Sequence, residues 1–242
     1  MAQYFAQEAA MTFRDVPVES VNTLFRKVYQ WMAAGLALTA VTAYVVASSP
    51  AVLQILFGSG PGVLIGIVIA EVALVLWLSM GINKISAGTA GILFTLYSAL
   101  NGVMCSSVLL VYTQGSVYQA FISTAGMFAL MSVYALYTQR DLTGFGSFLR
   151  MGLFGLVIAM VINMFVGSSM ADFAISIFGV LIFLGLTAWD TWKIKQLAYG
   201  MDGTGETGAA AMSKVAIIGA LALYLDFINI FLYMLRFIGK RK

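Results

Sequence analysis

The stretch VAIIGALALYLDFINIFLYML, residues 215–235, decides the fold class of this chain. It stays apolar for about the 20 residues that an α-helix needs to cross the hydrocarbon core of a bilayer. The stretch carries one acidic residue, Asp226. Its apolar residues follow one another without the alternation of a barrel strand, so it predicts a membrane-spanning helix.

Six earlier stretches have the same character, and the composition of the whole chain agrees with them. Of its 242 residues, 61% are hydrophobic and 10% are charged, whereas a soluble domain carries about a quarter charged residues. The sequence therefore predicts an all-α fold, a polytopic membrane protein built as a seven-transmembrane-helix bundle. The earlier spans are expected at Tyr29–Ala47, Gly62–Met80, Gly88–Tyr112, Ser116–Tyr137, Phe148–Val166 and Phe173–Trp192.

The transmembrane domain is expected to cover residues 29–238, between a cytoplasmic N-terminal tail, residues 1–28, and a basic C-terminal tail, residues 239–242. Residues Pro50–Phe57, between the first two spans, are expected to form a short interfacial piece. The lipid bilayer is thus the first expected partner. The net charge of +3 is compatible with nucleic-acid binding, but the basic residues lie in short gaps between spans. That is the pattern of membrane topology, and we expect no nucleic-acid partner.

The basic residues are distributed unevenly between the two sides of the membrane. Alternate gaps place nine on the side of the N-terminus and none in the three loops of the other side: Arg14, Arg26, Lys27, Lys84, Arg140, Arg150, Lys193, Lys195 and Lys214. By the positive-inside rule the N-terminus is cytoplasmic. A full seventh crossing exports the basic end of the chain, whereas a re-entrant segment keeps it inside. We expect the full crossing, because the nine residues outweigh Arg236, Lys240, Arg241 and Lys242.

Three acidic residues lie inside the apolar spans: Glu71, Asp190 and Asp226. An aspartate in the middle of a span costs about 2.5–3.5 kcal/mol on insertion scales, so it is normally paired or faces a wet cavity. Function is therefore the first hypothesis for Asp226, and a structural hydrogen bond between helices is the alternative. Asn229 lies one turn further along and is a candidate hydrogen-bonding neighbour.

Asp190 and Asp226 are candidates for a carboxyl pair between the sixth and seventh spans. Two carboxylates in a poorly hydrated site cannot both ionise cheaply, so one keeps its proton near neutral pH. Such a pair is a proton switch and a ligand for hard cations such as calcium. Depth counting opposes the pairing, because Asp226 lies about 17 Å beyond Val215 while Asp190 is near the end of its span. Helix tilt, a longer sixth helix or a water-filled cytoplasmic vestibule has to close this gap.

Glu71 fits two descriptions equally, a third carboxylate that lines a pore or a group neutralised by hydrogen bonds within the bundle. The chain has no histidine, which excludes a serine protease triad and makes a zinc site improbable. A response to pH near neutrality must then come from carboxyl groups or another perturbed group.

Three segments resemble the Bax inhibitor, or transmembrane Bax-inhibitor-motif, family in its bacterial branch. They are Ala222-Leu223-Tyr224-Leu225-Asp226-Phe227-Ile228-Asn229-Ile230-Phe231, Leu186-Thr187-Ala188-Trp189-Asp190-Thr191 and Arg140-Asp141-Leu142-Thr143. The resemblance implies an inner-membrane bundle whose last helix is central and wrapped by the first six. It also implies a pH-sensitive calcium leak in which Asp190 and Asp226 bind calcium and sense pH.

Two departures from the family pattern concern gating. Trp189 stands where the family commonly has tyrosine, and the basic residue that latches the pair in a relative corresponds to Ile82. Lys84 is the nearest substitute for that latch. We therefore expect a passive cation leak without a cofactor, in which calcium is the permeating ion.

Two other functions compete with the leak. A regulatory protein that modulates a membrane protease or a stress and survival complex needs no transport, and similar bacterial proteins include modulators of a membrane protease. An intramembrane aspartyl protease also needs two aspartates, but proteases of the presenilin type carry Gly-x-Gly-Asp, whereas Asp226 follows Leu223-Tyr224-Leu225. We therefore expect that the chain is not an enzyme.

Overall fold

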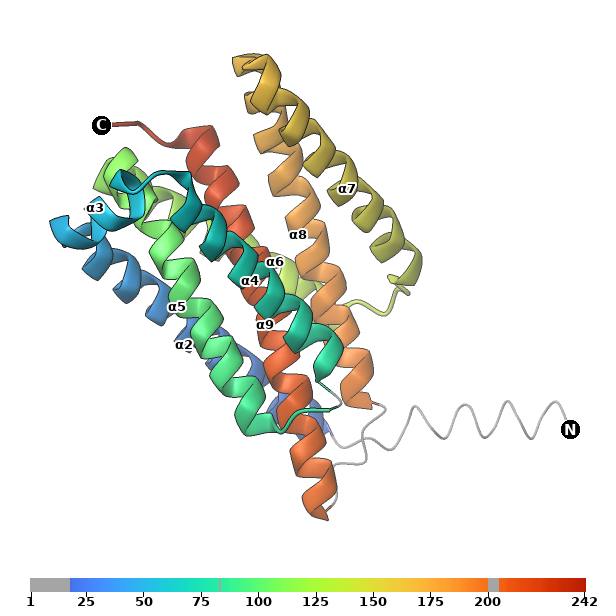
Figure 1. Ribbon diagram of the computed structural model, residues 1–242. Helices are drawn as coiled ribbons and strands as arrows, with labels where there is room; N and C mark the ends of the chain where they lie inside the picture. Colours follow the sequence, from blue (N-terminus) through green and yellow to red (C-terminus); the bar gives the residue numbers. More distant parts are fainter. Residues whose placement is uncertain (1–17, 83, 200–204) are drawn as a thin grey trace, which may run out of the picture.

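The computed structural model describes residues 18–82, 84–199 and 205–242 as a bundle of long helices. Seven helices in this part of the chain are long and apolar enough to cross a membrane. Figure 1 shows them side by side, with one short helix between the first two. The helices are α2 (Val18–Ala47), α3 (Pro50–Gly58), α4 (Pro61–Gly81), α5 (Ala87–Val111), α6 (Gln114–Tyr137), α7 (Thr143–Val166), α8 (Ser169–Tyr199) and α9 (Gly205–Ile238).

The seven predicted spans are confirmed as helices, but the first, fifth, sixth and seventh are longer than the sequence indicated; the fifth begins at Thr143 and the seventh at Gly205. The first helix begins at Val18 rather than near Tyr29, because Leu24 and Phe25 are buried and continue its apolar face. The sixth continues to Tyr199 rather than ending at Trp192. Most of the predicted N-terminal tail, residues 1–17, lies outside the described residues.

Local sequence signals explain where the helices begin. Pro50 and Pro61 occupy first turns, where the missing N–H of proline has no intrahelical acceptor to lose. Ser86 and Thr113 cap α5 and α6, because their hydroxyl oxygens accept hydrogen bonds from Thr89 N and Ser116 N. The short segment predicted between the first two spans is the helix α3.

Asp141 fixes the loop between α6 and α7. Its carboxylate accepts hydrogen bonds from the Thr143 hydroxyl (2.6 Å) and the Thr143 N–H (2.8 Å). These two bonds lower the pKa of the exposed Asp141 carboxyl, since they stabilise its charged form. The motif Arg140-Asp141-Leu142-Thr143 thus has a structural role at the start of α7.

The last helix, α9, is the centre of the bundle. It packs directly against α2, α5, α6 and α8, and it is the most buried of the membrane-crossing helices. Among its side chains Leu223, Tyr224 and Ile230 are fully buried. Apolar residues occur on most faces of α9 because most of its circumference meets other helices.

The helices α4 and α7 lie outside this inner group. Among the described helices α4 packs closely against α3 and α5, and α7 packs against α8. Figure 1 shows α7 leaning away from the rest of the bundle. The central position of the last helix is therefore confirmed, although four helices rather than six pack closely against it.

The C-terminal tail lies at the opposite end of the bundle from the start of α2 (Figure 1). It is bound to the turn between α5 and α6, where Lys242 N donates to Val111 O (2.9 Å) and Thr113 N donates to Lys240 O (3.1 Å). Arg241 forms an antiparallel bridge with Tyr112. The seventh segment is one continuous helix that is long and apolar enough to cross a membrane, as the predicted full crossing requires.

The helices α2 and α5 of the inner group approach each other closely. A Cβ atom on Gly102 of α5 would lie 2.7 Å from the backbone oxygen of Thr39 and 2.6 Å from Cβ of Thr42. Small residues let membrane helices approach closely enough for extensive van der Waals contact. Gly102 is therefore required by the packing of α2 on α5.

We expect Gly102→Ala to destabilise the bundle by about 1–3 kcal/mol, because the added methyl group overpacks a backbone contact. The matched control is Gly126→Ala in α6, where nothing lies within 4 Å of the new Cβ. Alanine stabilises a helix relative to glycine by about 1 kcal/mol, so the control should be neutral or stabilising. Thermal unfolding of the purified variants in detergent measures both effects, and equal stabilities would contradict the packing argument.

Candidate ion-binding site

The α9 helix places the carboxyl group of Asp226 in the middle of the bundle. The Asp226 side chain is 3% exposed, and its Oδ2 atom has no hydrogen-bond partner among the described residues. The side chains of Thr187 and Asp190 in α8 lie within interaction distance of this carboxyl group. A carboxyl group in such a position is costly unless it is protonated, paired or bound to a cation.

Asp190 comes from α8 and forms a carboxyl pair with Asp226. The two carboxyl groups lie near each other, and two such groups can share a hydrogen bond only when one of them holds a proton. Thr187 and Thr191 flank Asp190 on α8 and are fully buried. The structure thus brings together, across the α8–α9 interface, the two aspartates that the sequence analysis singled out.

The pair offers carboxylate oxygens to a cation but not a complete ligand shell. In the described part of the chain there is no group of three or more His, Cys, Asp or Glu residues that could hold a metal ion. Calcium takes six to eight oxygen ligands. The Thr187 hydroxyl, backbone carbonyls or water would have to supply the remainder, which suits transient binding better than a permanent metal centre.

A cavity of about 530 Å³ leads toward the pair from the end of the bundle where α9 begins. We call it the vestibule; it is lined by Ser79 of α4 and Ile82 directly after it, by Asp190, Lys193, Ile194 and Leu197 of α8, and by Ala210, Ala211, Lys214, Val215, Ile218, Gly219 and Ala222 of α9. On α9 the lining follows one helical face from Ala211 to Ala222, over about 16 Å. Asp226 is the next position on that face, one turn beyond Ala222.

Depth counting placed Asp190 near the surface and Asp226 deep in the bundle. The length of α8 and the vestibule explain how the two aspartates can nevertheless lie close together. Because α8 continues to Tyr199, Asp190 lies about two and a half turns inside the helix rather than at its end. The residues after Asp190 remain helical because Ile194 and Ala198 are buried against the bundle. The sequence analysis offered three explanations for the pairing: helix tilt, a longer sixth helix or a cytoplasmic vestibule. The structure shows the longer helix and a cavity where the vestibule was expected.

Glu71 does not join the pair. It lies on α4, where its side chain interacts with Asn101 and its Oε1 atom has no partner among the described residues. Tyr224 donates a hydrogen bond to Asn101 Oδ1 (3.2 Å), and its hydroxyl lies 2.6 Å from Thr39 Oγ1. Since successive α-helical residues are about 100° apart, Tyr224 and Asp226 project from nearly opposite faces of α9. Glu71 therefore belongs to a separate polar cluster.

Two other candidate residues do not contact the pair as proposed from the sequence. Asn229 donates from Nδ2 to the Leu225 carbonyl oxygen of its own helix (2.8 Å) rather than to Asp226. Lys84 is exposed in the turn after α4, while Ile82 faces the vestibule. The basic residues whose charges act on Asp190 are Lys193 and Arg150.

Lys195 is a buried cation that the sequence analysis assigned to a cytoplasmic gap. Its side chain is 8% exposed, and Nζ donates to the carbonyl oxygens of Leu136 and Thr138 (both 2.9 Å) and of Ala135 (3.3 Å). These carbonyl groups lie at the C-terminal end of α6, where partial negative charge accumulates. The sequence did not indicate this contact, because a lysine three residues after a tryptophan at the end of a span looks like an ordinary solvated residue.

The fold and the site together define a polytopic helical membrane protein with a carboxyl pair buried against its central helix. The protein-family model described as "inhibitor of apoptosis-promoting Bax1" matches residues 21–242. This chain therefore belongs to the Bax inhibitor family.

The chain is similar to curated bacterial proteins along nearly its whole length. It is 46% identical to the inner membrane protein YbhL of Escherichia coli K12, over 93% of this chain and 95% of the relative. It is 45% identical to an uncharacterized protein of Borreliella burgdorferi, over 91% of this chain and 93% of the relative. It is 36% identical to an uncharacterized membrane protein of Streptococcus pyogenes serotype M6, with the same two coverages.

We expect a cysteine at position 222 to react with a water-soluble maleimide if the vestibule is hydrated. The test uses a Cys105→Ser background, with Ala222→Cys compared with Ala220→Cys. Ala222 lines the vestibule, whereas Ala220 is 0% exposed between helices. Labelling at position 222 should be roughly tenfold faster, since thiolate reactivity follows access. Equal protection of both cysteines would contradict a hydrated vestibule.

Replacing Lys195 tests its role at the end of α6. We expect Lys195→Met to lower the free energy of unfolding by about 2–3 kcal/mol, because charge-assisted bonds to three carbonyl groups are lost. Lys84→Met removes an exposed lysine at the same end of the bundle and should change stability by less than about 0.5 kcal/mol. Thermal or denaturant unfolding in detergent compares them, and a neutral Lys195→Met would show that water replaces the lysine.

Proposed function

We propose that this protein is a passive calcium leak controlled by protonation of the Asp190–Asp226 pair. The observation that carries the proposal is an Asp226 oxygen without a partner among the described residues, next to Asp190, which itself lines the vestibule. Intramembrane carboxyl groups mark ion and proton pathways in other membrane proteins. The chain needs no resident cofactor for this function, because calcium is the ion carried.

Protonation controls the charge that the pair offers to a cation. When the two groups share a proton, the pair carries one negative charge and its oxygens are used in the hydrogen bond between them. Loss of that proton leaves two carboxylates that repel each other, and a hard divalent cation then relieves the repulsion. Calcium binding therefore increases as pH rises, and the shared proton displaces calcium and closes the path as pH falls.

Beyond the pair, the interface between α8 and α9 is closed. The Tyr233 ring of α9 packs over Gly179 of α8, where a Cβ atom would lie 2.7 Å from the ring, and it stacks on Phe183 with ring centroids 5.9 Å apart. Ile230 is fully buried in the same region. The path is thus open toward the vestibule and blocked toward the other end, so permeation requires α8 and α9 to separate at Tyr233.

The inferred location is the inner membrane of a bacterial cell, with the N-terminus in the cytoplasm. The name of YbhL as an inner membrane protein supports the location. The concentration of basic residues in the gaps at the end of the bundle near the start of α2 supports the orientation. The vestibule then opens toward the cytoplasm. We infer transport rather than catalysis for the pair, because it sits at the end of a cavity and lacks the Gly-x-Gly-Asp motif.

Calcium uptake into liposomes that contain the purified protein tests the proposal. Between about pH 6 and 8 we expect wild-type uptake to rise roughly tenfold, because the shared proton is lost. Asp226→Asn removes one carboxyl group, so its uptake should be low and independent of pH. Uptake is followed with an entrapped calcium dye.

Asp141→Asn is the control, because Asp141 is exposed in a loop outside the membrane-crossing helices. It should keep the wild-type pH dependence. An unchanged pH profile in Asp226→Asn would refute control by the pair. If no protein carries calcium faster than empty liposomes, the leak is refuted and the regulatory function without transport takes its place.

A further inference from the structure

We propose that an anionic phospholipid binds at the mouth of the vestibule, with its phosphate between Lys193 and Lys214. Both lysines line the vestibule, Lys193 from α8 and Lys214 from α9. Basic pockets between transmembrane helices on the cytoplasmic side bind anionic lipid headgroups. Lipid binding is independent of transport, and its effect on flux, described below, rests on the proposed calcium leak.

The two lysines lie on the outer side of the carboxyl pair. Lys193 follows Asp190 by about one turn toward the end of α8, and Lys214 lies about 18 Å before Asp226 along α9. Asp190 is therefore deeper in the vestibule than either ammonium group. A phosphate at the mouth meets positive charge first, whereas calcium has to pass the lysines before it reaches the carboxylates.

The Lys193 ammonium group is free to reach a headgroup. Its Nζ lies 5.1 Å from the centre of the Trp189 ring, and the side chain is exposed. A lysine can keep its apolar stem on the protein while its ammonium group reaches toward the lipid headgroups. A headgroup phosphate can therefore meet the Lys193 ammonium group at the mouth of the vestibule.

The vestibule also offers an apolar path for a lipid chain. Ile82 after α4, Ile194 and Leu197 of α8, and Ile218 of α9 line it. Among the described helices α4 packs closely on α3 and α5 and not on α8, so the α4 side of the vestibule is not closed by helix packing. A lipid whose headgroup lies on the lysines can extend an acyl chain along this wall.

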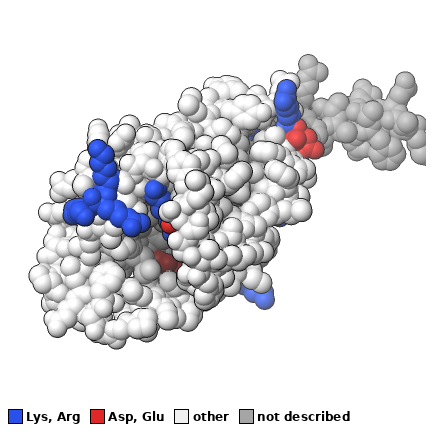
Figure 2. Space-filling view, turned by 90° about the horizontal axis from the view of Figure 1, so that it is seen from above, with Lys and Arg blue, Asp and Glu red and all other residues white. Residues whose placement is uncertain are grey.

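Basic residues also gather at the C-terminal end of the molecule, but they do not line the vestibule. Figure 2 views the molecule from above and shows basic side chains gathered beside a hollow in which acidic atoms are visible. The exposed basic residues of the C-terminal end are Arg236, Lys240, Arg241 and Lys242. The Lys242 ammonium group donates to Leu109 O (2.7 Å). Lys193 and Lys214, in contrast, line a cavity with apolar walls.

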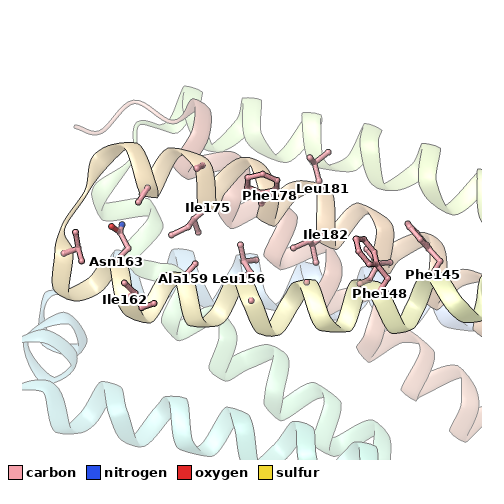
Figure 3. Close-up of a pocket in the computed structure, with 16 residues that line it drawn as sticks. Phe145, Phe148, Leu156, Ala159, Ile162, Asn163, Ile175, Phe178, Leu181 and Ile182 are labelled. Carbon is pink, nitrogen blue, oxygen red and sulfur yellow. The ribbon is translucent and has the colours of Figure 1, made fainter.

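A second place where a lipid could lie is an apolar groove, but no charged residue in the described part of the chain lines it. The groove between α7 and α8 has a volume of about 880 Å³ and is lined almost entirely by apolar side chains such as Phe148, Leu156 and Phe178 (Figure 3). Asn163 lies at one end of it and is already bonded to Ser168 O and Asp172. Nothing in this groove selects one lipid over another, whereas the two lysines of the vestibule select an anion.

Occupancy by the lipid changes the electrostatics of the route to the pair. Two positive charges at the mouth lower the local concentration of a divalent cation. A phosphate between them offsets this charge, so the proposed leak should carry calcium faster in membranes that contain anionic lipid. The lipid composition of the membrane then sets the rate of the leak.

Native mass spectrometry of the full-length protein with phosphatidylglycerol and phosphatidylcholine tests the binding. We expect wild-type protein to retain phosphatidylglycerol in preference, and Lys193→Gln/Lys214→Gln to lose that preference by roughly tenfold or more, since each lysine near an anionic surface contributes about 1 kcal/mol. Lys84→Gln/Arg140→Gln removes two exposed basic residues at the same end, outside the vestibule lining, and should bind as the wild type does.

Lys193→Arg/Lys214→Arg keeps the charge and should restore retention, which separates loss of charge from misfolding. The site is refuted if the glutamine pair retains phosphatidylglycerol as the wild type does, or if inorganic phosphate displaces the lipid at equal concentration. In calcium-uptake assays, phosphatidylglycerol should accelerate the wild type and the control pair but not the glutamine pair. If no protein carries calcium, the leak fails while the binding measurement still decides the lipid site.

Discussion

The position of one carboxyl group, that of Asp226, constrains most of the structure around it. A carboxyl group in the middle of a bilayer needs partners, and a single helix cannot supply them. The α8 helix supplies Asp190 and Thr187, and it stays helical beyond them because Ile194 and Ala198 are buried against the bundle. Asp190 therefore lies inside a continuous helix, at the depth where Asp226 needs a partner.

The central helix separates two polar regions that have different chemistry. Tyr224 faces the cluster of Thr39 and Asn101, in which hydroxyl and amide groups hydrogen-bond at 2.6–3.2 Å, and Glu71 adds a single carboxyl group with one oxygen without a partner. Asp226, on the nearly opposite face, meets a second acid and also keeps an oxygen without a partner. The first region stabilises the packing of α9 on α2 and α5, while only the second brings two carboxyl groups together.

Much of this arrangement follows from the sequence, because long apolar runs and isolated acids are strong signals in a membrane protein. The seven spans and the two aspartates of the pair were identified in this way. The end of α8 was not, because Lys193 and Lys195 look like a span boundary, and whether a lysine is solvated or binds carbonyl groups of another helix depends on tertiary packing. The same holds for Asn229, whose amide group had a backbone acceptor in its own helix, and for Lys84, which the turn after α4 directs away from the pair.

The C-terminal tail attaches one end of the central helix to its neighbours. Backbone bonds of Lys240 and Lys242 connect this end of α9 to the α5–α6 turn. Such an attachment opposes sliding of α9 along its axis more than a pivot about the attached end. Lys214 is about 39 Å from the attachment at Lys240, and Asp226 about 21 Å. Any swing of α9 about this attachment is therefore nearly twice as large at the vestibule mouth as at the carboxyl pair, and a small change at the aspartates is amplified at the membrane surface.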